Sequence, residues 1–246
     1  MSILENKTRV YFLDVSMEAV EEERQIRITE YLKERLSAGR QKKAETFRLP
    51  QDQALSLGAG FLLDLGLREY GLRERDVALG TTGNGKPVLL EYPQIHFNLS
   101  HSGTMAMAVF SDREVGCDVE REREARMPLA KRFFCPQEYA ALAALPEGTE
   151  RNQLFYRYWT LKESFLKVTG EGMRMPLNEF LIHTEEPVWA ESEGTRRPYV
   201  FREFSIPGYR AAICWKSTEA VSCEIVSKRL AACDGFFSFQ NLSDVV

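Results

Sequence analysis

The sequence predicts an α+β protein made of two similar halves in tandem. A pattern of strand, glycine turn and apolar strand occurs twice, since FNLSHSGTMAMAVF at 97–110 resembles FSIPGYRAAICW at 204–215. Each copy follows a segment with helical spacing of apolar residues, at 52–70 and at 149–169. Clefts between such units are common ligand sites, so we expect a pseudo-dimer with its active site in the cleft between the halves.

The halves are expected at 1–112 and 113–216, because Ser111-Asp112-Arg113 forms a turn between two apolar strands. The remaining segment, 217–246, contains no motif that we can assign. With 246 residues the chain has the length of one large domain or two small ones and is long enough to bury a core.

The first half opens with a predicted strand at 9–15, followed by an amphipathic helix from Met17 to Leu36. Six basic residues lie within 31–48, at positions 33, 35, 40, 42, 43 and 48. A run of this kind is either a solvated face or a binding surface for anions. An apolar helix at 52–70 and a glycine turn at 83–87 follow.

The next segment alternates apolar and polar residues, which predicts a half-buried strand. Ile95, Phe97 and Leu99 occupy one face, and His96, Asn98 and Ser100 occupy the other. Further strands are predicted at 105–110 and 115–120. In the second half we predict an apolar patch at 132–142, one long helix from Thr149 as N-cap to a stop at Gly170, and a strand pair at 201–206 and 209–215.

The composition excludes several classes of protein. The chain is 44% hydrophobic and 28% charged, unlike a disordered, collagen-like or disulfide-scaffold chain. Its net charge of −4 argues against nucleic acid as a partner. The N-terminus lacks a signal pattern, and no apolar run approaches membrane-spanning length. The five cysteines are odd in number and form no C-x-x-C pair, which favours reduced thiols, a cytoplasmic location and no zinc site.

The segment Val115-Gly116-Cys117-Asp118-Val119-Glu120 contains the most informative pair of acids. In a strand, Asp118 and Glu120 share one face with Gly116, while the apolar residues point into the core. Carboxylates placed in this way suit Mg²⁺, which commonly binds one or two carboxylates together with substrate phosphates. The alternative is an acidic edge strand exposed to solvent.

The long helix contributes a third acid. Trp159, Glu163 and Lys167 are spaced four residues apart and therefore share one helix face. Glu163 and Lys167 can form an ordinary surface ion pair, or Glu163 can complete a metal site with a lysine one turn away. The segment Asn98–Gly103 adds hydroxyls, a histidine and a glycine turn, a combination able to present donors to an anion.

Together these segments resemble the 4′-phosphopantetheinyl transferase superfamily, specifically its surfactin-synthetase-type group. The matching stretches occur in the order of the family and spread over most of the chain. They are GKP at 85–87, HFNLSHSG at 96–103, VGCDVE at 115–120, KRFFCPQEY at 131–139 and WTLKESFLKVTGEGM at 159–173.

The resemblance implies the phosphopantetheinyl transferase fold, with coenzyme A bound between the halves and the tail 217–246 packed back on the first half. It implies an enzyme that moves the 4′-phosphopantetheine arm of coenzyme A to a serine of an apo acyl or peptidyl carrier protein and releases adenosine 3′,5′-bisphosphate. A monomer, Mg²⁺ as cofactor and no membrane partner are the corresponding expectations.

The resemblance also implies roles for individual residues. Asp118, Glu120 and Glu163 would hold Mg²⁺. Glu163, Lys167 and His101 would be catalytic, with Glu163 as the base for the serine hydroxyl. The residues expected to contact coenzyme A are Arg40, Lys43, Ser56, Lys86, Ser100, His101 and Lys167. Where the family often has an arginine shortly before the hydroxyl position, this chain has Gln53-Ala54-Leu55.

Two other functions compete with this interpretation. One is a different Mg²⁺-dependent diphosphate transferase, such as a nucleotidyl transferase; the absence of a Walker-type loop disfavours an ATPase. The other is a non-catalytic protein that binds coenzyme A or a carrier. For a carrier, the apolar segment 132–134 with Lys131 beside it is a candidate docking patch, and core packing is its alternative.

Overall fold

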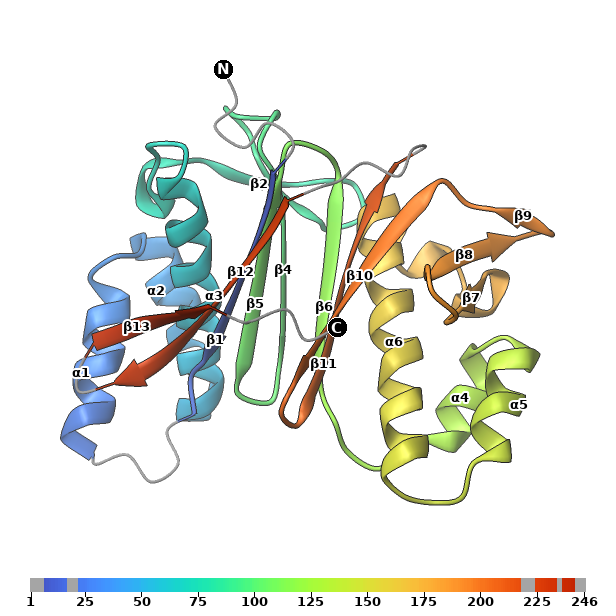
Figure 1. Ribbon diagram of the computed structural model, residues 1–246. Coiled ribbons are helices and arrows are strands. Elements are labelled where there is room, and N and C mark those ends of the chain that lie inside the picture. Colours follow the sequence, from blue (N-terminus) through green and yellow to red (C-terminus); the bar gives the residue numbers. More distant parts are fainter. Residues whose placement is uncertain (1–6, 17–21, 218–223, 234–235, 242–246) are drawn as a thin grey trace.

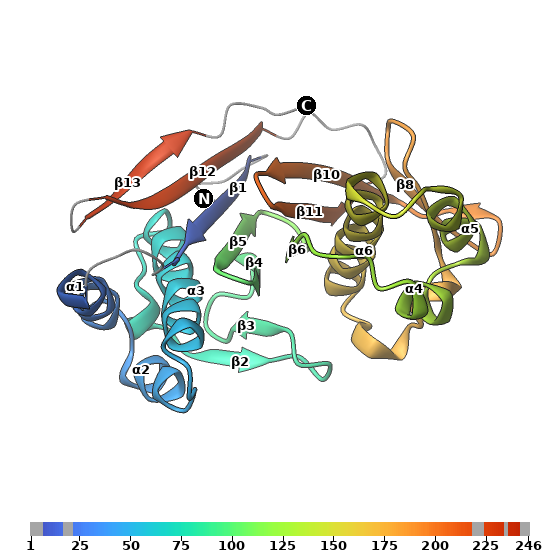
Figure 2. The same cartoon turned by 90° about the horizontal axis from the view of Figure 1, so that it is seen from below.

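The computed structural model describes residues 7–16, 22–217, 224–233 and 236–241 (Figure 1). Two sheets form the centre of the molecule. A five-stranded sheet has the order β13-β12-β1-β5-β4 and a three-stranded sheet the order β10-β11-β6. Long helices lie on the outer sides of these sheets, α3 on one side and α6 on the other (Figures 1 and 2). The class is α+β, as predicted.

The first half contains the larger sheet and three helices. The helices are α1 (Glu22–Lys33), α2 (Ala38–Glu45) and α3 (Pro50–Arg68), followed by the short 3-10 helix η1 (Glu74–Asp76). The strands of the sheet from this half are β1 (Lys7–Asp14), β4 (His96–Ser102) and β5 (Met105–Ser111), and a separate hairpin is formed by β2 (Leu79–Thr81) and β3 (Pro87–Leu89). Helix α3 buries its leucines against β1, β4 and β5 and forms one core with them.

The second half contains the smaller sheet, the long helix and a small peripheral sheet. Its main strands are β6 (Val115–Arg121), β10 (Tyr199–Ile206) and β11 (Tyr209–Lys216). Its helices are α4 (Met127–Phe133), α5 (Pro136–Ala144) and α6 (Thr149–Thr169), with 3-10 helices η2 (Gly172–Arg174) and η3 (Leu177–Glu179). The peripheral strands are β7 (Leu181–His183), β8 (Trp189–Ser192) and β9 (Thr195–Arg196).

The repeated sequence pattern forms two hairpins of the same kind. β4 and β5 are joined at Gly103, and β10 and β11 are joined at Gly208; both glycines have positive φ, 61° and 76°. Only glycine adopts this conformation without strain, which explains why both copies of the pattern contain it at the turn. A long helix packs on each hairpin's sheet, α3 on β5 and α6 on β11.

The two halves meet along β4 and β6 through side chains. The backbone N–H groups of Cys117, Val119 and Arg121 donate to the side-chain oxygens of Asn98, Ser100 and Ser102, at 2.9, 3.4 and 3.2 Å. The polar face of β4 therefore satisfies the edge of β6, which a buried edge requires. A shared apolar core of residues from β1, β5, β6 and β11 lies behind this contact.

Several elements differ from the sequence prediction. The helix expected from Met17 to Leu36 is observed at 22–33 (residues 17–21 lie outside the described residues), and part of the basic segment 31–48 forms α2, for which no helix was predicted. Thr149 is the first residue of α6, and Gly148 is its N-cap. Strands β12 (Glu224–Cys233) and β13 (Phe236–Asn241), in the unassigned tail, join the first sheet, where β12 runs parallel to β1.

In the described part of the chain no helix is long and apolar enough to cross a membrane. Cys117, Cys135 and Cys214 are free, buried thiols. Cys223 and the side chain of Cys233 lie outside the described residues.

Candidate active site

Strand β6 and helix α6 bring the three predicted acids into one neighbourhood. Asp118 is buried on β6, with its Oδ1 2.7 Å from the Lys167 ammonium and 2.8 Å from the Ser100 hydroxyl. Glu120, two residues along the same face, accepts a hydrogen bond from Ser102 at 2.6 Å. Glu163 lies one turn before Lys167 on α6, so it faces the same strand.

Burial and neighbouring charges shift the pKa values of these groups. Burial and the negative charge of Asp118 raise the pKa of both Glu120 and Glu163 above the usual range of a glutamate. Burial is the largest single influence on the Lys167 ammonium and opposes its charge, but Asp118, Cys117 and Glu163 together outweigh burial and raise the pKa of Lys167. Three acids thus share one lysine, an arrangement with unbalanced negative charge.

This cluster has the chemistry that a hard divalent cation requires. Asp118 Oδ2 is buried and has no hydrogen-bond partner among the described residues, and buried carboxylate oxygens seldom lack one. In the described part of the chain no three Asp, Glu, His or Cys side chains converge as closely as the ligands of one ion. The three carboxylates are of the type and charge that Mg²⁺ prefers. In this structure Asp118 and Glu120 accept hydrogen bonds from Ser100, Ser102 and Lys167.

Gly116 explains how α6 comes so close to β6. A Cβ atom placed at Gly116 would lie 2.2 Å from the Ser164 carbonyl oxygen and 2.6 Å from the Val168 amide nitrogen. Both are backbone atoms of α6, so a rotamer change cannot relieve the contact. The glycine of the Gly-x-Asp-x-Glu pattern thus sets the distance between the helix and the acids.

Replacing Gly116 with alanine is expected to force α6 away from β6. Overpacking of this kind costs about 1–3 kcal/mol, and we expect the free energy of unfolding in urea to fall by at least the upper end of this range. Gly83→Ala is the matched control, because a Cβ at Gly83 meets nothing within 4 Å. An unchanged free energy of unfolding in Gly116→Ala would show that the helix does not depend on this contact.

A cavity of about 760 Å³ lies on the other side of β4, within the first half. Its wall contains four of the residues predicted to contact the co-substrate, namely Arg40, Lys43, Ser56 and His101. Residues of α2, α3, the β2–β3 hairpin and β4 make up the lining, and none comes from the second half. This cavity thus lies within the first half, whereas the acids meet Ser100 and Ser102 where the two halves join.

The reason is the alternation of side chains along β4. His101 points toward the cavity with Phe97 and Leu99, whereas Ser100 points toward Asp118. Ser100 and His101 were both predicted to contact coenzyme A, and as consecutive strand residues they lie on opposite faces of β4. Burial and the nearby charges of Lys167 and Lys43 lower the pKa of His101.

Lys86 also differs from its predicted placement. Gly85 and Pro87 line the cavity, but the Lys86 ammonium lies 2.7 Å from Glu114 and 3.1 Å from the Val115 carbonyl oxygen. Its side chain therefore reaches to the start of β6.

Two functional contacts were not predicted from the sequence. Glu74 is buried in the cavity wall and accepts hydrogen bonds from the Ser37 amide and hydroxyl at 2.7 and 3.1 Å and from Arg40 Nε at 3.5 Å. Glu74 therefore anchors the start of α2 through Ser37 and holds the guanidinium of Arg40. Ser102 binds Glu120, and the i, i+2 alternation from Ser100 on β4 could have indicated this contact.

A smaller cavity of about 160 Å³ adjoins the acids on the side of the second half. Its lining includes Ser102, Glu120, Arg126, Tyr156 and Trp159. The larger cavity contains His101 in its wall, the adjacent Ser100 contacts Asp118, and Glu120 lines the smaller cavity.

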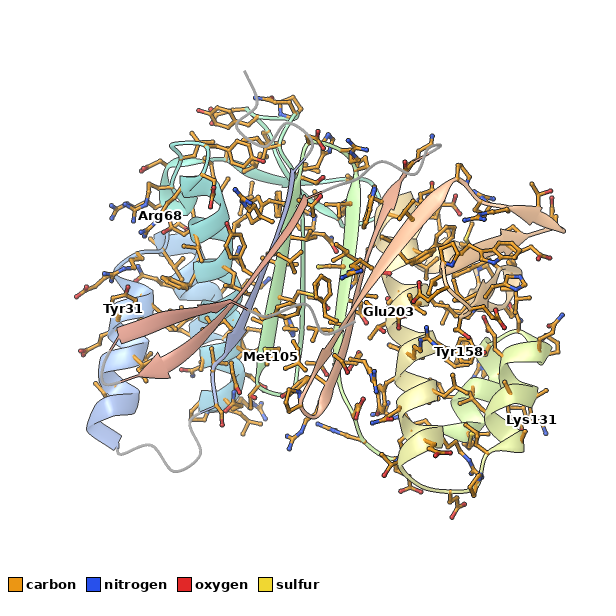
Figure 3. All side chains as sticks on the ribbon, in the orientation of Figure 1. Tyr31, Arg68, Met105, Lys131, Tyr158 and Glu203 are labelled. Carbon is orange, nitrogen blue, oxygen red and sulfur yellow. The ribbon has the colours of Figure 1, made fainter. Side chains whose placement is uncertain are left out.

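The proposed docking patch at 132–134 is largely core. Phe134 is buried and stacks on Phe155 with ring centroids 5.5 Å apart. Phe133 is half-buried, while Arg132 and Lys131 are exposed; Lys131 lies on the outer side of the molecule (Figure 3). The apolar part of the patch is therefore mostly unavailable to a partner, because the end of α4 directs Phe134 inward.

The comparisons with known proteins identify the family of this chain. Residues 114–214, which contain β6 and α6, match the family model of the 4′-phosphopantetheinyl transferase superfamily. The chain is 35% identical over 150 residues to the 4′-phosphopantetheinyl transferase Sfp of Bacillus subtilis, covering 60% of this chain and 66% of that protein.

Two further relatives are aligned over more of their length. The chain is 32% identical to the 4′-phosphopantetheinyl transferase psf-1 of Bacillus pumilus, covering 82% of this chain and 90% of that protein. It is 31% identical to the 4′-phosphopantetheinyl transferase ffp of Bacillus subtilis, covering 76% and 84%. The chain therefore belongs to the 4′-phosphopantetheinyl transferase superfamily.

Proposed function

We propose that this enzyme transfers the 4′-phosphopantetheine arm of coenzyme A to a serine hydroxyl of an apo acyl or peptidyl carrier protein and releases adenosine 3′,5′-bisphosphate. One observation carries the proposal. The site follows β4, where His101 lies in the wall of a cavity with Arg40 and Lys43, and the adjacent Ser100 contacts Asp118 and Lys167. Its order of charges matches that of coenzyme A, in which a 3′-phosphate on adenosine precedes the diphosphate and the pantetheine arm.

The cavity would hold the adenosine and its 3′-phosphate. Arg40 and Lys43 on α2 supply positive charge, and Ser56 on α3 supplies a hydroxyl in the same wall. Glu74 keeps Arg40 in place. The smaller cavity beyond Glu120 lies where the pantetheine arm and the carrier serine would arrive if the diphosphate lies beside Lys167 and His101.

Asp118, Glu120 and Glu163 would hold Mg²⁺, which supplies neutralising charge to the diphosphate when bound. Lys167 and His101 would donate to the diphosphate oxygens where negative charge accumulates. The lowered pKa of His101 keeps its ring neutral at pH 7, and a neutral ring still donates one N–H.

The serine needs a base, since its hydroxyl is a weak nucleophile at neutral pH. Glu163 would accept the hydroxyl proton, directly or through water, as a general base. The serine oxygen forms a bond to the phosphorus that carries the pantetheine, and the bond from this phosphorus to the bridging oxygen breaks. Adenosine 3′,5′-bisphosphate leaves with the electron pair.

The mass of an apo carrier protein after incubation with the enzyme, coenzyme A and Mg²⁺ tests the proposal. We expect a gain of one phosphopantetheine that disappears when EDTA is added. Coenzyme A binding with an unchanged carrier mass would instead support the non-catalytic binding protein. Transfer from another nucleoside diphosphate derivative, with none from coenzyme A, would support a different diphosphate transferase.

Lys43→Ala is expected to raise KM for coenzyme A about tenfold or more, because a charge-assisted hydrogen bond to phosphate contributes roughly 1.5–3 kcal/mol. Dephospho-coenzyme A lacks the 3′-phosphate, so its KM should change little. Lys42→Ala is the matched control, since Lys42 is an exposed neighbour on α2 outside the cavity wall. Equal effects of Lys43→Ala on both substrates would argue against recognition of the 3′-phosphate.

A further inference from the structure

The tip of the β2–β3 hairpin joins the two halves at the end of the site. The hairpin belongs to the first half by sequence, but its tip contacts the second half at two places. Lys86 binds Glu114 and the Val115 carbonyl oxygen at the start of β6. The Asn84 side-chain amide donates to the carbonyl oxygen of Gly170, the residue that ends α6.

The same hairpin forms part of the cavity wall. Leu79, Gly80 and Thr81 of β2 line the cavity, as do Gly85 and Pro87 on either side of Lys86. Figure 2 shows the hairpin extending from the side of α2 and α3 toward α6. One short element thus touches the cavity on one side and the end of α6 on the other.

Helix α6 carries Glu163 and, one turn later, Lys167, which lies in the last turn of the helix. Any shift of this turn moves both side chains relative to β6. The Gly170 carbonyl is at the end of the helix, where backbone oxygens lack partners within the helix, so the amide of Asn84 satisfies one of them.

Glu114 is well suited to hold the tip. Its Oε2 accepts from Lys86, and its Oε1 lies 3.2 Å from His96 Nδ1 on β4. The His96 and Lys86 contacts lower the pKa of Glu114 to about 2, so the carboxylate is charged throughout the neutral range. The Lys86 side chain is only 12% exposed, which favours a defined position over a solvated one.

We propose that Asn84, Lys86 and Glu114 tie the cavity wall to α6, and that Lys86 is a positioning residue. Its ammonium holds the hairpin against β6 and is not a ligand of the nucleotide. Occupation of the cavity is thereby coupled to the placement of Glu163 and Lys167. This inference rests on the proposed function only in assigning a reaction to those two residues.

A double-mutant cycle of Lys86→Met and Glu114→Gln tests the tie in the full-length enzyme. Each single variant is expected to lower kcat for carrier modification about fivefold with little change in KM for coenzyme A. The double variant should be no worse than either single variant, because contacting residues are coupled. Lys33→Met is the control, since it breaks an ion pair with Glu45 that stays within the first half.

If Lys86 were instead a ligand of coenzyme A, Lys86→Met would raise KM and Glu114→Gln would behave like the unmodified enzyme. That result would overturn the proposal.

Hydrogen exchange without any substrate gives a second readout. Asn84→Ala and Lys86→Met should increase exchange of the amides at 168–171, at the end of α6, and unchanged exchange in both would also overturn it. This readout does not depend on whether the enzyme modifies carriers, so failure of the proposed function is recognised separately.

Discussion

Glu163→Gln is expected to lower kcat for carrier modification by about 10²–10⁴-fold, the usual contribution of a general base. Glutamine keeps the shape of the side chain but cannot take the serine proton, and it removes one of three negative charges near the metal position. The fold should persist, because Glu163 is partly exposed and lies on the helix face toward the site, while the buried stripe of α6 is untouched.

The measurement is steady-state transfer from coenzyme A to an apo carrier at saturating Mg²⁺, with circular dichroism as the check on folding. Glu150→Gln is the matched control, because it makes the same substitution at an exposed position on the same helix. Near-normal turnover in Glu163→Gln would remove Glu163 from both of its proposed roles.

Lys162→Met is expected to lower the free energy of unfolding by about 3–5 kcal/mol, the cost of leaving a buried charge unpaired. Lys162 and Glu138 form an ion pair of 2.9 Å, and both side chains are completely buried. The ammonium also donates to the carbonyl oxygens of Leu177 and Phe180, and Glu138 accepts from the amides of Cys135 and Ile182. The pair therefore connects α6, α5 and the chain entering β7.

Urea unfolding of two further variants makes this prediction specific. Lys33→Met breaks an exposed ion pair and should cost less than about 1 kcal/mol. Combining Lys162→Met with Glu138→Gln removes both charges, and we expect it to recover part of the lost stability. A cost for Lys162→Met as small as that for Lys33→Met would contradict this account of the buried pair.

Local patterns predicted the elements that position the site. Helix α6 was expected from Thr149 to Gly170 and is observed at Thr149–Thr169, with Gly170 at a φ of 70°. The alternation in β6 was also confirmed, since Val115, Cys117 and Val119 lie in the core and Gly116 faces α6. In both cases the periodicity reflects burial of one face, a property that the sequence carries locally.

Long-range pairing and short helices were not predictable in this way. β12 pairs with β1 from the opposite end of the chain, and no local pattern encodes that partner. α4 and α5 are short and have proline in their first turns, and for this region only an apolar patch at 132–142 was predicted. The placement of Lys86 likewise depends on Glu114, whose position relative to the hairpin is set by the tertiary structure.

The central claim is that Asp118, Glu120 and Glu163 bind one divalent cation beside the diphosphate of coenzyme A. The most direct measurement is a crystal structure of the enzyme with coenzyme A and Mn²⁺, using the anomalous signal of the metal. We expect one Mn²⁺ bonded to these three carboxylates, with the adenosine in the cavity lined by Arg40 and Lys43. Mn²⁺ bound elsewhere, or coenzyme A bound outside that cavity, would contradict the account.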